Sequence, residues 1–103
     1  MTKTDILLRK FIRETKKMLR DSGWCQGNFF DERGGACLVG AICVVRTKPG
    51  INATKKQYYK LERILNEVMG MNIELTTWND MPGRKKSEVF ALLDKAYNKI
   101  GGK

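Results

Sequence analysis

The chain of 103 residues contains no histidine, and this absence narrows the chemistry open to it. Histidine is the commonest general base near neutral pH and the commonest metal ligand, so a serine–histidine or cysteine–histidine pair cannot form within one chain. The cysteines, Cys25, Cys37 and Cys43, are spaced unlike the common zinc motifs. We therefore expect no metal site, no cofactor and no enzymatic activity.

Long apolar runs are also missing. No stretch approaches the roughly 20 apolar residues that a membrane-spanning helix needs. The opening "MTKTDILLRKFIRETKK" places charges inside its apolar pattern, which is unlike a signal peptide. An odd cysteine count without such a peptide predicts reduced thiols that serve as small core residues. We expect a cytoplasmic protein with no membrane partner.

Acidic residues are scarce. The sequence has 11 Asp and Glu against 20 Lys and Arg, which gives a formal net charge of +9. Such an excess indicates attraction to polyanions, namely nucleic acid, nucleotides or an acidic protein, although solubility is the simpler interpretation. The length fits a single domain over residues 1–103.

Apolar residues at helical spacing predict an all-α fold, a compact bundle of three to four helices with two long structured loops. The first helix is expected from about Asp5 to Arg20, capped by Thr2 or Thr4. Its inward stripe consists of Leu8, Phe11, Ile12, Thr15 and Leu19. A basic row lies on the opposite face and is a candidate anion-binding surface: Arg9, Arg13, Lys16, Lys17 and Arg20.

The remaining elements are expected from three further patterns. The apolar segment 36–46 fits a buried helix. Val44 and Val45 favour a strand, however, and so short a run does not distinguish helix from strand by its hydrophobic period. Its Gly40-Ala41 pair would let a neighbouring helix approach closely. Thr54 and Gln57 form a capping box that starts a third helix, which ends at Gly70. The segment "MNIELTTW" reads as a short extended piece, and a last helix is expected over residues 85–100.

The loop "SGWCQGNFFDERGG", residues 22–35, is unusually aromatic for a connection. Trp24, Phe29 and Phe30 are large apolar side chains that gain free energy on burial. We therefore expect this loop to fold back over the core.

A second loop, "WNDMPGR", places a tryptophan, an amide and a carboxylate just ahead of the last helix. In a structural interpretation, which we favour, Trp78 fills the core and Asn79 or Asp80 bonds backbone near the start of that helix. In a functional interpretation the loop forms a pocket, in which aromatic rings stack on a flat ligand, polar side chains bind its edge and an arginine meets a phosphate. The pocket residues would be Trp24, Gln26, Trp78, Asn79, Asp80 and Arg84.

Three ordered blocks of the sequence resemble a family of uncharacterised domains found in actinobacteria and bacteriophages. The blocks are Trp24-Cys25-Gln26-Gly27, Cys37-Leu38-Val39-Gly40-Ala41, and Trp78-Asn79-Asp80 followed by Pro82-Gly83-Arg84. The resemblance implies a small single domain that a phage can encode, without an established activity. It also implies a threonine cap after Pro-Gly-Arg, where this chain has Lys85. The capping box with Glu88 is then lost, and Ser87, Asn79 or Asp80 is expected to replace it.

These observations predict a small, basic, non-enzymatic binding module that engages an anionic target, either nucleic acid or a nucleotide. The basic row on the first helix would sit against phosphates without reading sequence. The alternative is a protein–protein inhibitor or adaptor whose partner is a host protein, such as a phage protein that acts against host defence or in host takeover. Binding that depends on salt separates the first class from the second.

Overall fold

The computed structural model describes residues 1–102 and consists of helices and connecting loops. Over those residues the prediction of an all-α fold is confirmed, but there are five helices instead of three to four. The helices are α1 (Lys3–Ser22), α2 (Leu38–Arg46), α3 (Lys55–Met69), α4 (Leu75–Asn79) and α5 (Lys86–Lys99).

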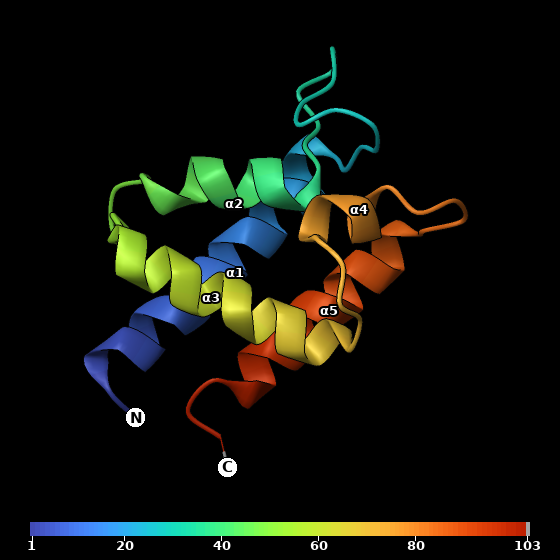
Figure 1. Cartoon of the computed structure of the whole chain (residues 1–103). Helices are drawn as coiled ribbons and strands as arrows, with labels where there is room; N and C mark the ends of the chain where they lie inside the picture. Colours follow the sequence, from blue (N-terminus) through green and yellow to red (C-terminus); the bar gives the residue numbers. More distant parts are fainter. Residues whose placement is uncertain (103) are drawn as a thin grey trace.

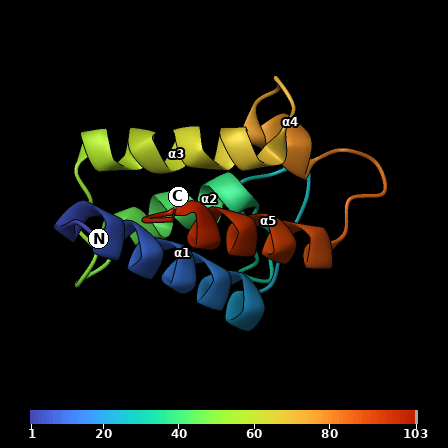
Figure 2. The same ribbon diagram turned by 90° about the horizontal axis from the view of Figure 1, so that it is seen from below.

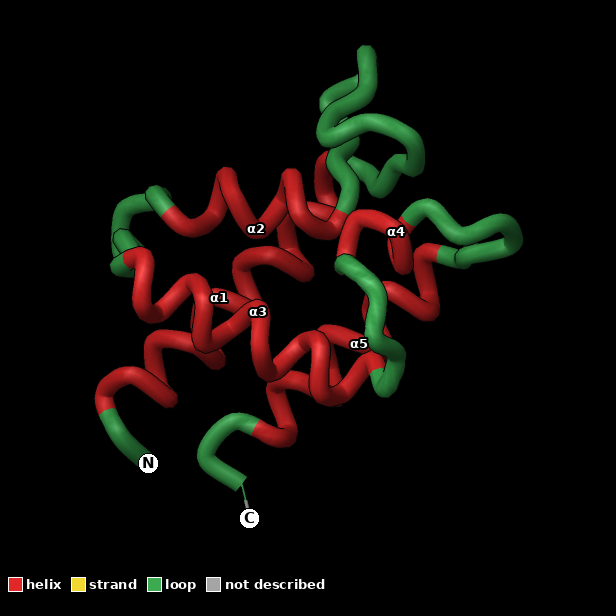
Figure 3. Tube along the Cα trace, in the orientation of Figure 1, coloured by secondary structure: helices red, strands yellow, loops and turns green. Residues whose placement is uncertain are grey.

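The helices form two layers with α2 across the top. Figure 1 shows α3 and the short α4 in front of α1, and Figure 2 shows α1 and α5 side by side on the far side of the molecule from α3 and α4. Two of the connections, residues 23–37 and 80–85, project from the helices (Figure 3). The first of them stands out furthest, beside the start of α2.

Helix α1 supplies the centre of the core. Its predicted inward stripe is buried without exception: Leu8, Phe11, Ile12, Thr15 and Leu19. Thr2 caps the helix, because its hydroxyl accepts from Asp5 N at 3.0 Å while the Asp5 carboxylate accepts from Thr2 N at 3.2 Å. The one polar member of the stripe, Thr15, donates its hydroxyl proton to Phe11 O at 2.9 Å, so its burial leaves no polar atom unsatisfied.

Segment 36–46 forms the predicted helix, but its glycine serves a different purpose from the one expected. A Cβ on Gly40 would collide with the backbone carbonyl oxygen of Phe29, so the close neighbour is the aromatic loop and not another helix. The thiol of Cys37 caps the helix by accepting from Gly40 N at 3.3 Å. The three cysteines are free, as expected for reduced thiols, but Cys43 is exposed and is not the core residue predicted.

In the second half of the chain, the predicted start and end of one helix are confirmed, and one predicted extended segment is wrong. The predicted capping box of Thr54 and Gln57 starts α3, and Gly70 ends it in the left-handed conformation with φ 72°. The expected extended piece at 71–78 is wrong, since residues 75–79 form α4. This turn is helical because Leu75 and Trp78, three apart, both reach the core.

Helix α5 starts with half of a capping box. Lys85 has no side-chain acceptor, yet its backbone N–H donates to the Glu88 carboxylate at 2.8 Å. The expectation that this box is lost is therefore wrong for its Glu88 half. The replacement caps that were expected, from Ser87, Asn79 or Asp80, are wrong too: no hydrogen bond to the start of α5 comes from any of their side chains over the described residues.

Candidate functional site

The first candidate site centres on Asn79, which is completely buried next to the nearly buried Trp78. Its Oδ1 accepts from Trp24 Nε1 at 2.7 Å and from Leu38 N at 3.1 Å. Its Nδ2 donates to Cys25 O at 3.1 Å and to Asp80 Oδ1 at 2.9 Å. An amide side chain has two donors and an acceptor oxygen with two lone pairs, so every hydrogen-bonding position of Asn79 is filled by the chain itself.

Two further side chains complete this arrangement. Gln26 Nε2 donates to Asn79 O at 3.0 Å and Met81 O at 3.1 Å, and Asp80 Oδ1 accepts from Gly27 N at 3.0 Å. The Gly27 N–H and the Asn79 amide together hold the pKa of Asp80 below its ordinary value. We call Trp24, Gln26, Asn79 and Asp80 the clamp.

The clamp ties the first loop and the start of α2 to the end of α4. Asn79 and Asp80 were expected to bond near the start of α5, and this is wrong. They form hydrogen bonds with residues 24–27 of the first loop and with the first residue of α2, Leu38. The sequence did place Trp24 and Gln26 near this motif, and the structure brings them there. Their polar atoms are engaged with one another, which supports the structural interpretation over the pocket.

Arg84 is also engaged within the protein. Its guanidinium carbon lies 3.9 Å from the centroid of the Trp78 ring, and its Nε donates to Trp78 O at 3.0 Å. A further nitrogen pairs with Glu88 at 3.2 Å, and only 12% of the arginine side chain is exposed. This charge therefore fixes the loop 80–85 to Trp78 and to α5.

The aromatic loop does not bury its phenylalanines. Trp24 is half-buried against the core, but Phe29 is 56% exposed and Phe30 is 50% exposed, so their predicted burial is wrong. Their exposure does not come from a loose backbone. Phe29 O accepts from Cys37 N at 3.0 Å, and Asp31 Oδ1 accepts from Arg33 N at 2.9 Å and Gly35 N at 2.7 Å.

The second candidate site is the basic row of α1, which lies beside α5. Arg9 places its guanidinium 4.7 Å from the Tyr97 ring centroid and donates from Nε to Ile100 O at 3.1 Å. Arg13 lies 5.6 Å from the same ring. Lys16 pairs with Asp94 at 2.8 Å and lies 5.7 Å from the Phe90 ring.

Two features of this surface were not predicted. Lys86 of α5 lies 5.5 Å from the Phe90 ring, so one ring is flanked by lysines of both helices. Lys17, in contrast, lines a hollow with Val44 and Lys48 on the α2 side of α1. We call the surface beside α5 the ridge. It comprises Arg9, Arg13 and Lys16 of α1 with Lys86, Phe90 and Tyr97 of α5, and it includes the exposed Arg20, which continues the α1 row at helical spacing.

A signal for the α5 half of the ridge was present in the sequence. Lys86, Phe90 and Tyr97 are separated by four and seven residues, which places them on one helix face. The missing information was which helix packs beside that face. The antiparallel pairing of α1 with α5 supplies it, since Arg9 meets Tyr97 while Lys16 meets Phe90.

Neither a metal centre nor a membrane span is found over residues 1–102. No group of three or more side chains there is placed to hold a metal ion, and none of the helices is long and apolar enough to cross a membrane.

The structure is thus that of a small, basic, all-helical protein with a clamped aromatic loop. Residues 3–99 match a family of unknown function, DUF6197, and the chain belongs to that family. No curated protein and no solved structure matches it.

Proposed function

We propose that this protein is a non-enzymatic binding module that engages nucleic acid through the ridge. The observation that carries the proposal is the row of cations lying over aromatic rings, with Arg9 and Arg13 at Tyr97 and Lys16 and Lys86 at Phe90. A net charge of +9 attracts any polyanion, but this row gives the charge a defined surface.

The chemistry of the ridge suits a sugar–phosphate backbone. Guanidinium and ammonium groups neutralise phosphates, and bases can pack against the guanidinium planes and the exposed parts of the two rings. Two carboxylates, Asp94 and Asp21, pair with Lys16 and Arg20, so the five cations of the ridge keep an excess of positive charge. Contacts of this kind favour binding that tolerates different sequences.

A nucleotide is the second anionic ligand, and the ridge is the better place for it as well. The clamp offers less to a nucleotide because the polar atoms of Asn79 are already bonded to the chain. Arg84, which would have met the phosphate, is stacked on Trp78 and paired with Glu88.

The test is a binding titration with a fluorescently labelled single-stranded oligonucleotide, followed by anisotropy at several salt concentrations. The ridge variant Arg13→Glu/Arg20→Glu is compared with Lys56→Glu/Arg63→Glu, which changes two exposed cations of α3 and alters the net charge equally. The ridge variant should bind at least about tenfold more weakly than this control, and its salt slope should fall by about 0.7 per lost phosphate contact. Equal losses in both variants, or no binding by the wild type at low salt, would overturn the proposal.

The alternative function, a protein–protein inhibitor or adaptor, is favoured by one observation, the exposed pair Phe29 and Phe30. Large exposed aromatics are typical of protein interfaces. If a bacteriophage encodes the chain, such a protein would meet its target in the host cytoplasm and act against host defence or in host takeover. Partner binding that persists at high salt would support this alternative over the nucleic-acid module.

A further inference from the structure

The acidic residues of this basic protein are distributed unevenly. Six of the eleven form ion pairs with lysine or arginine within residues 1–102. The other five form none with the described residues, and they gather around the first loop, α4 and the facing side of α3. They are Asp31, Glu32, Glu62, Glu74 and Asp80.

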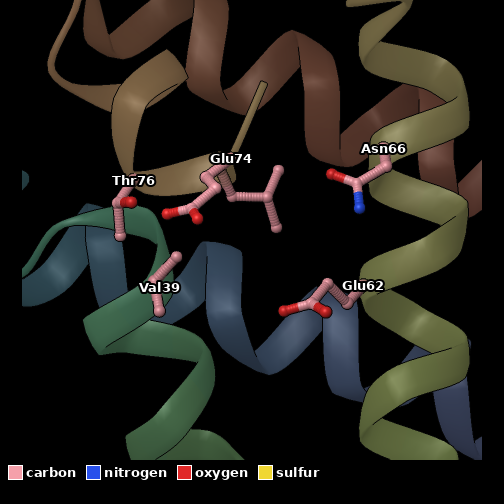
Figure 4. A pocket seen from close by; sticks show the side chains of 6 residues that line it. Val39, Glu62, Asn66, Glu74 and Thr76 are labelled. Atoms are coloured by element: carbon pink, nitrogen blue, oxygen red, sulfur yellow. The ribbon is translucent and has the colours of Figure 1, made fainter. Parts of the chain in front are cut away.

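A row of three adjoining hollows connects these carboxylates. In the first, of about 260 Å³, Glu62 and Asn66 of α3 face Glu74, Thr76 and Val39 (Figure 4). The second, of about 370 Å³, shares Thr76 with the first and continues past Asp80, Cys37 and Phe29 to Asn28.

The third hollow, of about 650 Å³, shares Asn28 with the second and is lined by Phe30, Asp31, Glu32 and one cation, Arg33. The shared residues place the three hollows next to one another, and we call them together the groove. It runs from α3 past α4 to the tip of the aromatic loop.

The aromatic side chains of the groove are presented by a fixed backbone. The carbonyl oxygen of Phe29 accepts a hydrogen bond from Cys37 N and lies against Gly40. The clamp ties residues 24–27 to α4. Phe29 and Phe30 nevertheless keep half or more of their surface exposed. Because the backbone that carries this pair is fixed before binding, less conformational entropy is lost when a partner covers it.

We propose that the groove is a docking surface for an extended, basic segment of a partner protein. Lysine or arginine side chains of that segment would pair with Glu62, Glu74 and Glu32, while an apolar side chain would cover the two phenylalanine rings. Charge complementarity selects this occupant, because carboxylates that form no ion pair within residues 1–102 collect here on a chain of net charge +9. The groove is lined by residues of the first loop, α2, α3 and α4, whereas the ridge is formed by α1 and α5, so this inference does not rest on nucleic-acid binding.

A direct test uses a synthetic peptide of alternating arginine and leucine, with a peptide of alternating glutamate and leucine as the charge control. Calorimetric titration compares the wild type with Glu32→Gln/Glu74→Gln and with Phe29→Ala/Phe30→Ala. The matched controls are Asp21→Asn/Glu67→Gln, two exposed carboxylates elsewhere, and Tyr59→Ala, an exposed ring on α3. The changed side chains are all exposed, and circular dichroism of each variant verifies that it folds.

The wild type should bind the basic peptide and not the acidic one. Each groove variant should weaken this binding about tenfold, while the control variants stay within about twofold of the wild type. Binding that is unchanged in the groove variants, or absent at low salt, would overturn the proposal. Self-association of the wild type at low salt that both groove and ridge variants abolish would also overturn it, since the occupant would then be a second copy of the chain.

Discussion

The clamp and the ridge are both rich in polar side chains, but they differ in where their hydrogen-bonding atoms point. In the clamp, Asn79 is completely buried and all of its hydrogen-bonding positions are filled by Trp24, Leu38, Cys25 and Asp80. In the ridge, cations rest on partly exposed rings, and Arg13 forms no ion pair with the described residues. The contrast separates a polar cluster that stabilises the fold from the one that we propose binds a ligand.

The largest effect in this comparison should follow from removing the amide at the centre of the clamp. Asn79→Ala removes the acceptor of the half-buried Trp24 indole N–H and of the buried Leu38 N–H. We expect a loss of roughly 2–4 kcal/mol in the free energy of unfolding, measured by urea denaturation. Asn66→Ala, an exposed amide of α3, is the control and should change stability by less than about 0.5 kcal/mol. Equal effects of the two substitutions would contradict the account.

A second, smaller effect tests how the aromatic loop is seated on α2. Gly40→Ala gains about 1 kcal/mol of helix propensity but drives a methyl group into the carbonyl of Phe29, and overpacking costs about 1–3 kcal/mol. We expect the collision to exceed the propensity gain and to lower the midpoint of thermal unfolding. A rise in that midpoint would mean that the loop does not press on the helix as described.

A third effect, with the opposite sign, concerns the start of α5. Lys85→Thr adds a hydroxyl that can accept a backbone N–H and completes the capping box with Glu88. The free energy of unfolding should rise by about 0.5–1 kcal/mol. Lys86→Thr, one residue inside the helix, removes the same charge without adding a cap and should give no such rise.

The smallest effect is the dependence of the clamp on pH. The pKa of Asp80 is lowered in the folded protein by the Gly27 N–H and the Asn79 amide. Its contribution is therefore present above the unfolded value of about 3.9 and is lost as pH falls through the folded value. The stability difference between wild type and Asp80→Asn should shrink below about pH 4. A difference that grows on acidification has the wrong sign for this explanation.

Much of the fold could be predicted from local patterns. The buried stripe of α1 follows from spacing, and the start of α3 follows from Thr54 and Gln57. The five-residue α4 was missed because one turn is too short to show a period, and only its packing makes it helical. The half-exposed Phe29 and Phe30 were missed because apolar side chains are not obliged to be buried.

The sequence identified most residues of the candidate sites, but it did not identify the groups that those residues contact. The sequence singles out Trp24, Gln26 and Asn79, but their hydrogen bonds join residues more than fifty positions apart. Neither propensity nor spacing reports which distant groups a buried amide will meet. The same limit hid the α5 half of the ridge, since the neighbours of Lys86 depend on how α5 lies against α1.

The division between clamp and ridge is tested most directly by an NMR titration of the isotope-labelled protein with a single-stranded oligonucleotide. The account predicts that the side-chain resonances of Arg9 and Arg13 and the ring resonances of Tyr97 shift with added nucleic acid, because these groups form the ridge. The Trp24 indole N–H, which is bonded to Asn79, should stay at its position throughout the titration. A titration that moves the Trp24 indole signal and the Asn79 side-chain amide while the ridge signals stay fixed would contradict the account.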